Sequence, residues 1–377
     1  MKYLVPLSLF LVSSLPAATL SVVNHSFEDI IEEDITNEFT FGPLLGWDLY
    51  EVTVNLTSGG DGPSFFVGTL TPQLDTATSD PDDFINFPAG ASDGIRVGIA
   101  FNFDNTRDTG AYGLQQATSH TFAANTSYTL QVDVGNIASG QSLASGFFNL
   151  DGFPGYRIAL MADGIEIETD SSAGTIAEGA FATASLTYVT GSTGGVIGQT
   201  IGIRLVNLND SNSGTDVPAM NDLEVDFDNV RLDATAVPPL EAWRFDNFET
   251  TVSIGDAAND FDYDFDGLPN LVEFLLGLDP TVYDFEGAVT AEVTDVGGMD
   301  YLALTFDRDL EATGVTLSVR ATSDLGLDLS SWDTINPDGA NQVSSGTVGN
   351  IETLTVRDNM PTSGVTKRFM LLEVTEP

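Results

Sequence analysis

Short runs of alternating apolar and polar residues dominate the chain between residues 19 and 233. Residues 94–101, 127–133 and 201–206 are clear examples, with hydrophobic or β-branched side chains at alternate positions. Such alternation predicts strands that bury one face. Gly, Asn, Asp and Ser clusters separate the runs, and helical periodicity is nearly absent. The pattern therefore predicts a jelly-roll β-sandwich in this part of the chain.

The pattern changes at residues 236–240, where two consecutive prolines favour extended backbone and form a stiff linker. Residues 240–248 then predict a short helix. Residues 269–276 predict a second helix, which Gly277 ends.

Alternating strand patterns return from residue 298 to the end of the chain. They predict a second, smaller β-sandwich. The protein is thus expected to be mainly β. Its expected organisation is a signal peptide at 1–18, a jelly-roll β-sandwich at 19–235, a linker with a helical calcium-loop segment at 236–285, and a small β-sandwich at 286–377.

The first residues have the composition of a secretory signal peptide. A positively charged start at Lys2 precedes an almost wholly apolar run over residues 3–15, and Pro16, Ala17 and Ala18 follow. Small residues after a short apolar run suit a signal peptidase. No other apolar run is long enough to span a bilayer. We therefore expect a secreted, extracellular protein without a membrane span.

Acidic residues far outnumber basic ones, 56 against 12, which gives a formal net charge of −44. So negative a surface repels phosphate backbones, so we expect no nucleic-acid partner. It suits either the attraction of divalent cations or solvation in saline water. The chain has no cysteine, so core burial and bound metal are the expected sources of stability.

Residues 262–273 match the spacing of the twelve-residue calcium loop. Carboxylates and an amide stand at its ligand positions, and Gly267 at the sixth position allows the sharp turn. Calcium is favoured over magnesium, which prefers a rigid octahedron with retained waters. The expected ligands are the side chains of Asp262, Asp264, Asp266, Asn270 and Glu273 and the carbonyl of Leu268.

Residues 264–280 resemble the dockerin-like or thrombospondin type 3-like calcium segment of secreted proteins from Verrucomicrobia and related bacteria. The short tryptophan-containing stretch at 243–248 and the order of Trp332 and Arg368 in the tail are also similar to that family. The resemblance implies an appended extracellular module without catalytic function. A dockerin carries two such loops and this chain has one, so cohesin docking is not expected.

Two short motifs bracket the predicted jelly roll, at residues 22–28 and 227–232. Together with Trp47 they resemble the carbohydrate-binding modules of the galactose-binding-like jelly-roll type. The resemblance implies that the first and last strands pair. It also implies that Glu28 and Asp228 share a structural calcium.

A sugar site would need exposed aromatic rings beside polar groups. Trp47 follows a glycine at a strand start and is expected in the core, whereas Tyr50 and Tyr112 are open candidates. The glycine-rich stretch after residue 145 is the favoured ligand-binding loop, with Phe147, Phe148, Asn149, Asp151 and Tyr156.

Glu224, Asp226 and Asp228 alternate along one predicted strand and so share one face. They could form a cation patch. A solvent-exposed sheet edge is the simpler interpretation.

Motifs for catalysis are scarce. The two histidines, His25 and His120, have no recognisable triad or metal context, and there is no nucleophile elbow or phosphate loop. The sequence therefore predicts a secreted, non-catalytic calcium-binding protein, with a polysaccharide or cell-surface glycan bound to the jelly roll. Two alternatives stay open: an adhesive or structural surface protein that self-associates, and a glycoside hydrolase that uses two carboxylates.

Overall fold

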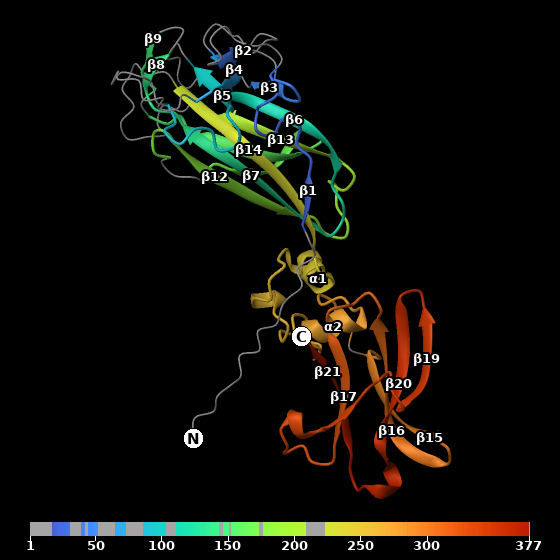
Figure 1. The fold of residues 1–377 in the computed structure, drawn as a ribbon. Coiled ribbons are helices and arrows are strands. Elements are labelled where there is room, and N and C mark those ends of the chain that lie inside the picture. Colours follow the sequence, from blue (N-terminus) through green and yellow to red (C-terminus); the bar gives the residue numbers. More distant parts are fainter. Residues whose placement is uncertain are drawn as a thin grey trace, which may run out of the picture. The chain divides into compact units, whose positions relative to one another are not determined.

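The computed structural model consists of two compact units, residues 15–236 and residues 237–377 together with 1–14. We describe each unit by itself (Figure 1). The structure describes residues 17–30, 39–41, 44–51, 65–72, 86–102, 111–142, 146–150, 152–172, 176–208, 223–284 and 286–376. The predicted signal peptide up to residue 16 lies outside these ranges. Within them, no helix is long and apolar enough to cross a membrane.

The N-terminal unit contains two antiparallel sheets (Figure 1). The seven-stranded sheet has the order β12-β7-β14-β5-β4-β2, and β1 also pairs with β14. Its strands are β1 (Ala18–Leu20), β2 (Phe39–Phe41), β4 (Phe65–Leu70), β5 (Val97–Asn102), β7 (Thr126–Asn136), β12 (Ala180–Val189) and β14 (Leu223–Ala236).

The five-stranded sheet has the order β11-β10-β13-β6-β3. Its strands are β3 (Asp48–Glu51), β6 (Tyr112–Thr121), β10 (Tyr156–Ala162), β11 (Ile165–Asp170) and β13 (Thr200–Asn207). A separate ribbon pairs β8 (Gly140–Ser142) with β9 (Gly146–Phe148). The mainly-β prediction is confirmed.

Side chains from both sheets form one hydrophobic core. Leu130, Val132 and Val134 alternate along β7, and Ile201, Ile203 and Leu205 alternate along β13; all six are fully buried. This is the two-residue period of strands with one face on the core. The first and last strands also pair, with Thr19 opposite Asp233 in the register, so the pairing implied by the resemblance is confirmed.

The other face of the seven-stranded sheet carries a second hydrophobic cluster. Val97, Ile99 and Phe101 alternate along β5, and Phe87 and Leu150 join them from outside the sheet strands. This face is therefore covered by apolar side chains and is not open to solvent.

The C-terminal unit begins with α1 (Pro239–Phe248), the 3₁₀ turn η1 (Gly255–Ala257) and α2 (Asn270–Leu276). Both helices were predicted. Pro269 precedes α2, and Gly277 ends it with a left-handed φ of 71°, a conformation that glycine adopts without steric cost.

Two small antiparallel sheets follow (Figure 1). One contains β15 (Val289–Val296), β16 (Met299–Asp309), β20 (Ile351–Pro361) and β19 (Gln342–Val348), in that order. The other contains β18 (Asp333–Ile335), β17 (Thr316–Thr322) and β21 (Phe369–Thr375). The turns η2 (Leu329–Ser331) and η3 (Thr362–Gly364) complete the unit. Leu268 and Leu276 pack into the core of these sheets, beside Phe306 and Val356.

Candidate functional site

Three acidic residues on β14 are buried under the cluster that covers the seven-stranded sheet. Glu224 is 6% exposed, and Asp226 and Asp228 are fully buried. The interpretation of this row as a solvent-exposed edge is wrong. Strand β14 lies between β7 and β5 in the middle of the sheet, and non-sheet residues cover the acidic face.

Asp226 is the most unusual of the three. Apart from the hydrogen bond that it shares with the Glu224 carboxyl, its side-chain oxygens have no hydrogen-bond partner among the described residues. Burial raises the pKa of Asp226 well above its usual value, and the neighbouring Glu224 carboxyl raises it further. An aspartate in this setting holds its proton at a pH where an exposed one has lost it. Asp226 is therefore a carboxyl group whose surroundings, on a strand in the middle of the sheet, favour its neutral acid form.

Two aromatic rings lie close to Asp226. Asp226 pairs in register with Gly135 on β7. A Cβ atom at Gly135 would lie 2.6 Å from the Phe181 ring, 2.9 Å from the Phe87 ring and 3.0 Å from the Asp226 Cβ. Phe87 and Phe181 stack on each other with ring centroids 4.4 Å apart. The Asp226 Cβ and the two stacked phenylalanine rings thus meet around Gly135.

Glu224 has a similar apolar neighbour. It pairs with Phe101 on β5, and the rings of Phe101 and Phe148 meet edge to face with centroids 5.7 Å apart. Phe148 was predicted as a ligand-binding residue, and it lies beside this site as a half-buried packing residue.

Tyr112 brings a phenol to Glu224 from the five-stranded sheet. The Asn207 side-chain amide donates to the Tyr112 hydroxyl oxygen at 2.9 Å and to the Ala100 carbonyl of the other sheet at 2.9 Å. Burial and the charge of Glu224 raise the pKa of Tyr112 well above its usual value. The phenol therefore stays protonated. The sequence suggested Tyr112 only as a candidate sugar-binding ring. No local pattern connects Tyr112 with Asn207 and Glu224, which lie far from it in the chain.

The other predicted ligand-binding residues do not form a shared platform. Phe147 is 66% exposed, whereas Tyr156 is buried and its hydroxyl donates to Asp170 at 2.8 Å. The expectation of Tyr156 as an exposed loop aromatic is wrong, because it belongs to β10. Asn149 is half-buried next to Ser139, and Asp151 lies outside the described residues. Trp47 is in the core, stacked on Phe27 as expected.

Glu28 and Asp228 lie around the same turn. Glu28 Oε1 accepts hydrogen bonds from the backbone of Ile95 and Arg96, both at 2.7 Å. Asp228 accepts one from the backbone of Asp93 at 2.7 Å, and burial raises its pKa to about 7. The two carboxylates thus bind the backbone of one turn. Their shared calcium stays a prediction.

The predicted calcium loop folds into a cage of carboxylates. Oxygens of Asp262, Asp264 and Asp266 lie within 4.8 Å of one another, and so do oxygens of Asp266, Glu273 and Asp284. Oxygens held 2.3–2.6 Å from one central calcium ion would show separations of this order.

Buried oxygens without partners make the cage fit a cation. Glu273 is fully buried, and neither of its carboxylate oxygens receives a hydrogen bond from a described residue. Burial and the charges of Asp264, Asp266, Asp284 and Asp262 raise its pKa to about 8. A buried carboxylate without donors is costly unless a cation neutralises it. The residues present therefore suit calcium.

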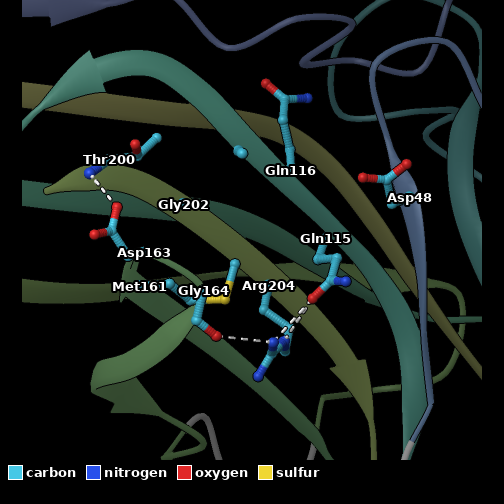
Figure 2. Close-up of a pocket in the computed structure, with 10 residues that line it drawn as sticks. Asp48, Gln115, Gln116, Met161, Asp163, Gly164, Thr200, Gly202 and Arg204 are labelled. Atoms are coloured by element: carbon cyan, nitrogen blue, oxygen red, sulfur yellow. Dashed lines mark hydrogen bonds between the residues drawn. The ribbon is translucent and has the colours of Figure 1, made fainter.

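A separate pocket of about 430 Å³ lies on the outer face of the five-stranded sheet (Figure 2). Its polar groups are largely engaged with one another. Arg204 donates to Gln115 Oε1 at 2.9 and 3.1 Å and to Glu166 Oε1 at 2.8 Å, and its guanidinium lies 4.1 Å from the Tyr50 ring centroid. The lining residues are Asp48, Gln115, Gln116, Ala117, Met161, Asp163, Gly164, Thr200, Gly202 and Arg204. Because these contacts are internal to the sheet, the buried acids of β14 are the stronger candidate for chemistry.

Residues 18–233 match the family model described as HpiC1-like, HpiC1 cyclase. The chain belongs to the HpiC1-like family. The matched region contains the whole acidic row of β14, together with Tyr112 and Asn207, and ends before the calcium loop.

This family membership overturns the function expected from the sequence. The prediction of a non-catalytic, glycan-binding protein is wrong, because the family is one of cyclases. Neither the adhesive alternative nor the glycoside hydrolase fits that family. The prediction rested on the absence of a triad, nucleophile elbow or phosphate loop, and a cyclase needs none of these motifs.

Solved structures of Fischerella cyclases are also similar to this chain. The Stig cyclase Fisc from Fischerella sp. TAU, in complex with (3Z)-3-(1-methyl-2-pyrrolidinylidene)-3H-indole, is 27% identical, with a TM-score of 0.47 over 59% of this chain and 100% of that one. A cyclase from the same organism in complex with 4-(1H-indol-3-yl)butan-2-one is 28% identical, with a TM-score of 0.46 over 58% of this chain and 98% of that one. No curated protein matches the chain.

Proposed function

We propose that the N-terminal unit is a cyclase in which the Glu224–Asp226 pair supplies the acid. The observation that carries the proposal is the fully buried Asp226 side chain. Its carboxyl has no partner among the described residues other than Glu224, and its Cβ lies beside Gly135, next to the Phe87 and Phe181 rings. A carboxylic acid in an apolar site keeps its proton to a higher pH than an exposed one, and bulk water does not compete with the substrate for that proton.

The chemistry that suits this site is proton-initiated ring closure. The acid gives its proton to a carbon–carbon double bond of the substrate, which leaves a carbocation. The π electrons of a second unsaturated group in the same molecule then form the new carbon–carbon bond. Loss of a proton to the carboxylate restores both the acid and the neutral product, so substrate and product are isomers.

The surroundings support each step. The faces of the aromatic rings attract a developing cation, and the two carboxyls lie close enough to hold one proton between them. A second negative charge on the pair is disfavoured, which keeps one carboxyl in the acid form. Tyr112, fixed by Asn207, can stabilise the Glu224 charge after proton transfer.

Turnover of aromatic-bearing alkenes by the full chain tests this proposal. The products are separated chromatographically and assigned by NMR as isomers with one ring more. We expect Glu224→Gln and Asp226→Asn each to lower the rate by about 10²–10⁴-fold, the usual contribution of a general acid. Asp48→Asn, an exposed carboxylate in the same unit, is the matched control. Unchanged turnover in both acid variants would reject the assignment.

Binding can be measured even before a substrate is found. The indole ligand 4-(1H-indol-3-yl)butan-2-one, present in a Fischerella cyclase structure, is a suitable probe for calorimetry. Phe148→Ala should weaken its binding because Phe148 packs against Phe101 beside Glu224. Phe147→Ala, at an exposed neighbour, should leave the binding constant unchanged.

We also propose that the loop at 262–273 binds calcium, in line with its dockerin-like or thrombospondin type 3-like sequence. The supporting observation is Glu273, fully buried with both oxygens unpartnered among the described residues. Calcium would be held by the loop carboxylates and would neutralise their mutual repulsion. The test is calorimetric titration of the chelator-treated protein with calcium and, separately, with magnesium. Absence of heat with millimolar calcium would rule the site out.

We further propose that the protein is exported, because residues 1–18 have the composition of a signal peptide. Expression in a bacterium, followed by N-terminal sequencing of the exported fraction, tests this. A mature start near Ala18 is expected. Protein retained in the cell with an intact Met1 would contradict it.

A further inference from the structure

We infer that Asp284, which lies outside the twelve-residue loop, is a further ligand of the same calcium ion. This inference rests on the proposed calcium site and adds a residue that the loop spacing does not contain. The starting observation is that Asp266 belongs to two carboxylate clusters, one with Asp262 and Asp264 and the other with Glu273 and Asp284. Because Asp266 is shared, the two clusters adjoin, and one ion between them would face all five carboxylates.

The oxygens in this cage have two distinct roles. One oxygen of each of three carboxylates holds the loop backbone: Asp262 Oδ2 accepts from Gly267 at 3.0 Å, Asp264 Oδ1 from Asp266 at 3.0 Å, and Asp266 Oδ1 from Leu268 at 2.8 Å. These bonds shape the turn. They also leave other oxygens of the cage available to a cation.

The remaining oxygens match the needs of calcium. Six buried oxygens receive no hydrogen bond from a described residue: Asp262 Oδ1, Asp264 Oδ2, Asn270 Oδ1, Glu273 Oε1, Glu273 Oε2 and Asp284 Oδ1. Calcium takes six to eight oxygens. Without the Asp284 oxygen, five of these side-chain oxygens would remain, which is fewer than the six to eight oxygens that calcium takes.

The orientation of the Asn270 side chain suits a bound cation. Its amide nitrogen donates to the carbonyls of Asp256 and Ala258, both at 2.8 Å. These two hydrogen bonds identify the nitrogen of the side-chain amide. The atom without a partner among the described residues is therefore the oxygen, Oδ1. The fully buried Glu273 beside it presents two more oxygens and no donor.

Asp284 is held at the cage by its own backbone. Its amide nitrogen donates to Asp266 Oδ2 at 3.3 Å. The turn before it is closed by Asp279, whose carboxylate accepts from the Thr281 backbone at 2.9 Å. Calcium bound to Asp284 would therefore fasten the chain that leads to β15 onto the loop, in addition to ordering the loop itself.

The experiment is calorimetric titration of the chelator-treated full chain with calcium chloride. We expect Asp284→Asn to weaken binding tenfold or more, and Asp260→Asn, an exposed aspartate just before the loop, to leave the dissociation constant within twofold. Terbium luminescence excited through the neighbouring Tyr283 is a second readout and should fall in parallel. Equal affinity of Asp284→Asn and wild type would overturn the inference while leaving the loop site in place. Absence of binding by wild type would reject both.

Melting curves separate a ligand from a merely structural residue. Removing one of five crowded carboxylates relieves repulsion, so Asp284→Asn should melt at the same or a higher temperature than wild type without metal, and gain less on calcium addition. A lower melting temperature without metal, with an unchanged gain from calcium, would assign Asp284 a structural role and overturn the inference.

Discussion

Asp226 on β14 and Gly135 on β7 lie opposite each other in the register of the central sheet. The missing side chain at Gly135 leaves the space that the Phe87 and Phe181 rings occupy beside the Asp226 Cβ. The acid and its aromatic surroundings are thus positioned by a residue that contributes no functional group. Glycine is used here for close approach rather than for a turn.

Gly135→Ala should therefore damage the site directly. The new Cβ would lie under 3.0 Å from both rings, so the rings must move away from Asp226. Overpacking of this kind costs about 1–3 kcal/mol. We expect a lower melting temperature together with a lower rate of the proposed ring closure. Gly195→Ala, where the new atom meets nothing within 4 Å, is the control; equal effects of both substitutions would contradict the packing argument.

Asp226 should make stability depend on pH. Burial raises its folded-state pKa well above that of the unfolded chain, about 3.9 for a free aspartate. Its contribution to stability is then full below about pH 4 and is lost as the pH rises toward the folded-state pKa. Asp226→Asn keeps the shape and removes the titration.

The melting temperature of Asp226→Asn should therefore exceed that of wild type at pH 8. The two proteins should melt together near pH 4. Calorimetric scans from pH 4 to pH 8 measure this. A constant difference between the two proteins across the range would show that Asp226 does not titrate abnormally.

Tyr112→Phe separates chemistry from packing. The ring stays in the core, and only the hydroxyl that accepts from Asn207 is lost. We expect a stability loss near 1 kcal/mol, as for one neutral hydrogen bond, and a reduction in kcat of about tenfold or more. Asn207→Leu should cost more stability because it also breaks the cross-sheet bond to Ala100. Full activity in Tyr112→Phe would remove the phenol from the mechanism.

Calcium should stabilise the protein through the loop at 262–273. Metal bound only by the folded state adds about 2.7 kcal/mol at a hundredfold excess over Kd. Asp266→Ala removes the carboxylate shared by both clusters and should abolish this gain. Scanning calorimetry with and without calcium measures it, and magnesium at the same concentration is the control. A full calcium gain in Asp266→Ala would place the ion elsewhere.

The sequence predicted the strands and helices better than it predicted which residues pack over them. Alternation along β13 located its buried side chains, and Pro269 and Gly277 marked the ends of α2, because these signals are local. The same alternation placed Glu224 and Asp226 on one face of β14. It could not tell that Phe87 and Leu150 cover that face, since those residues come from distant parts of the chain.

The calcium cage shows the same limit. Its loop residues follow a fixed spacing and were identified from it. Asp284 joins them only after the chain has passed through α2 and a further turn, so no spacing rule includes it. Tyr156 is a third case, where a glycine-rich approach suggested a loop but the residue begins β10.

The pairing of β1 with β14 has a consequence for protein engineering. The cyclase unit starts at Ala18, opposite Ala234 in the register, so its entry and exit are neighbouring strands. A unit whose two ends meet can be spliced into a surface loop of a host protein without stretching either. Joining those ends and opening the chain elsewhere would give circularly permuted cyclases that keep β14 in the middle of its sheet.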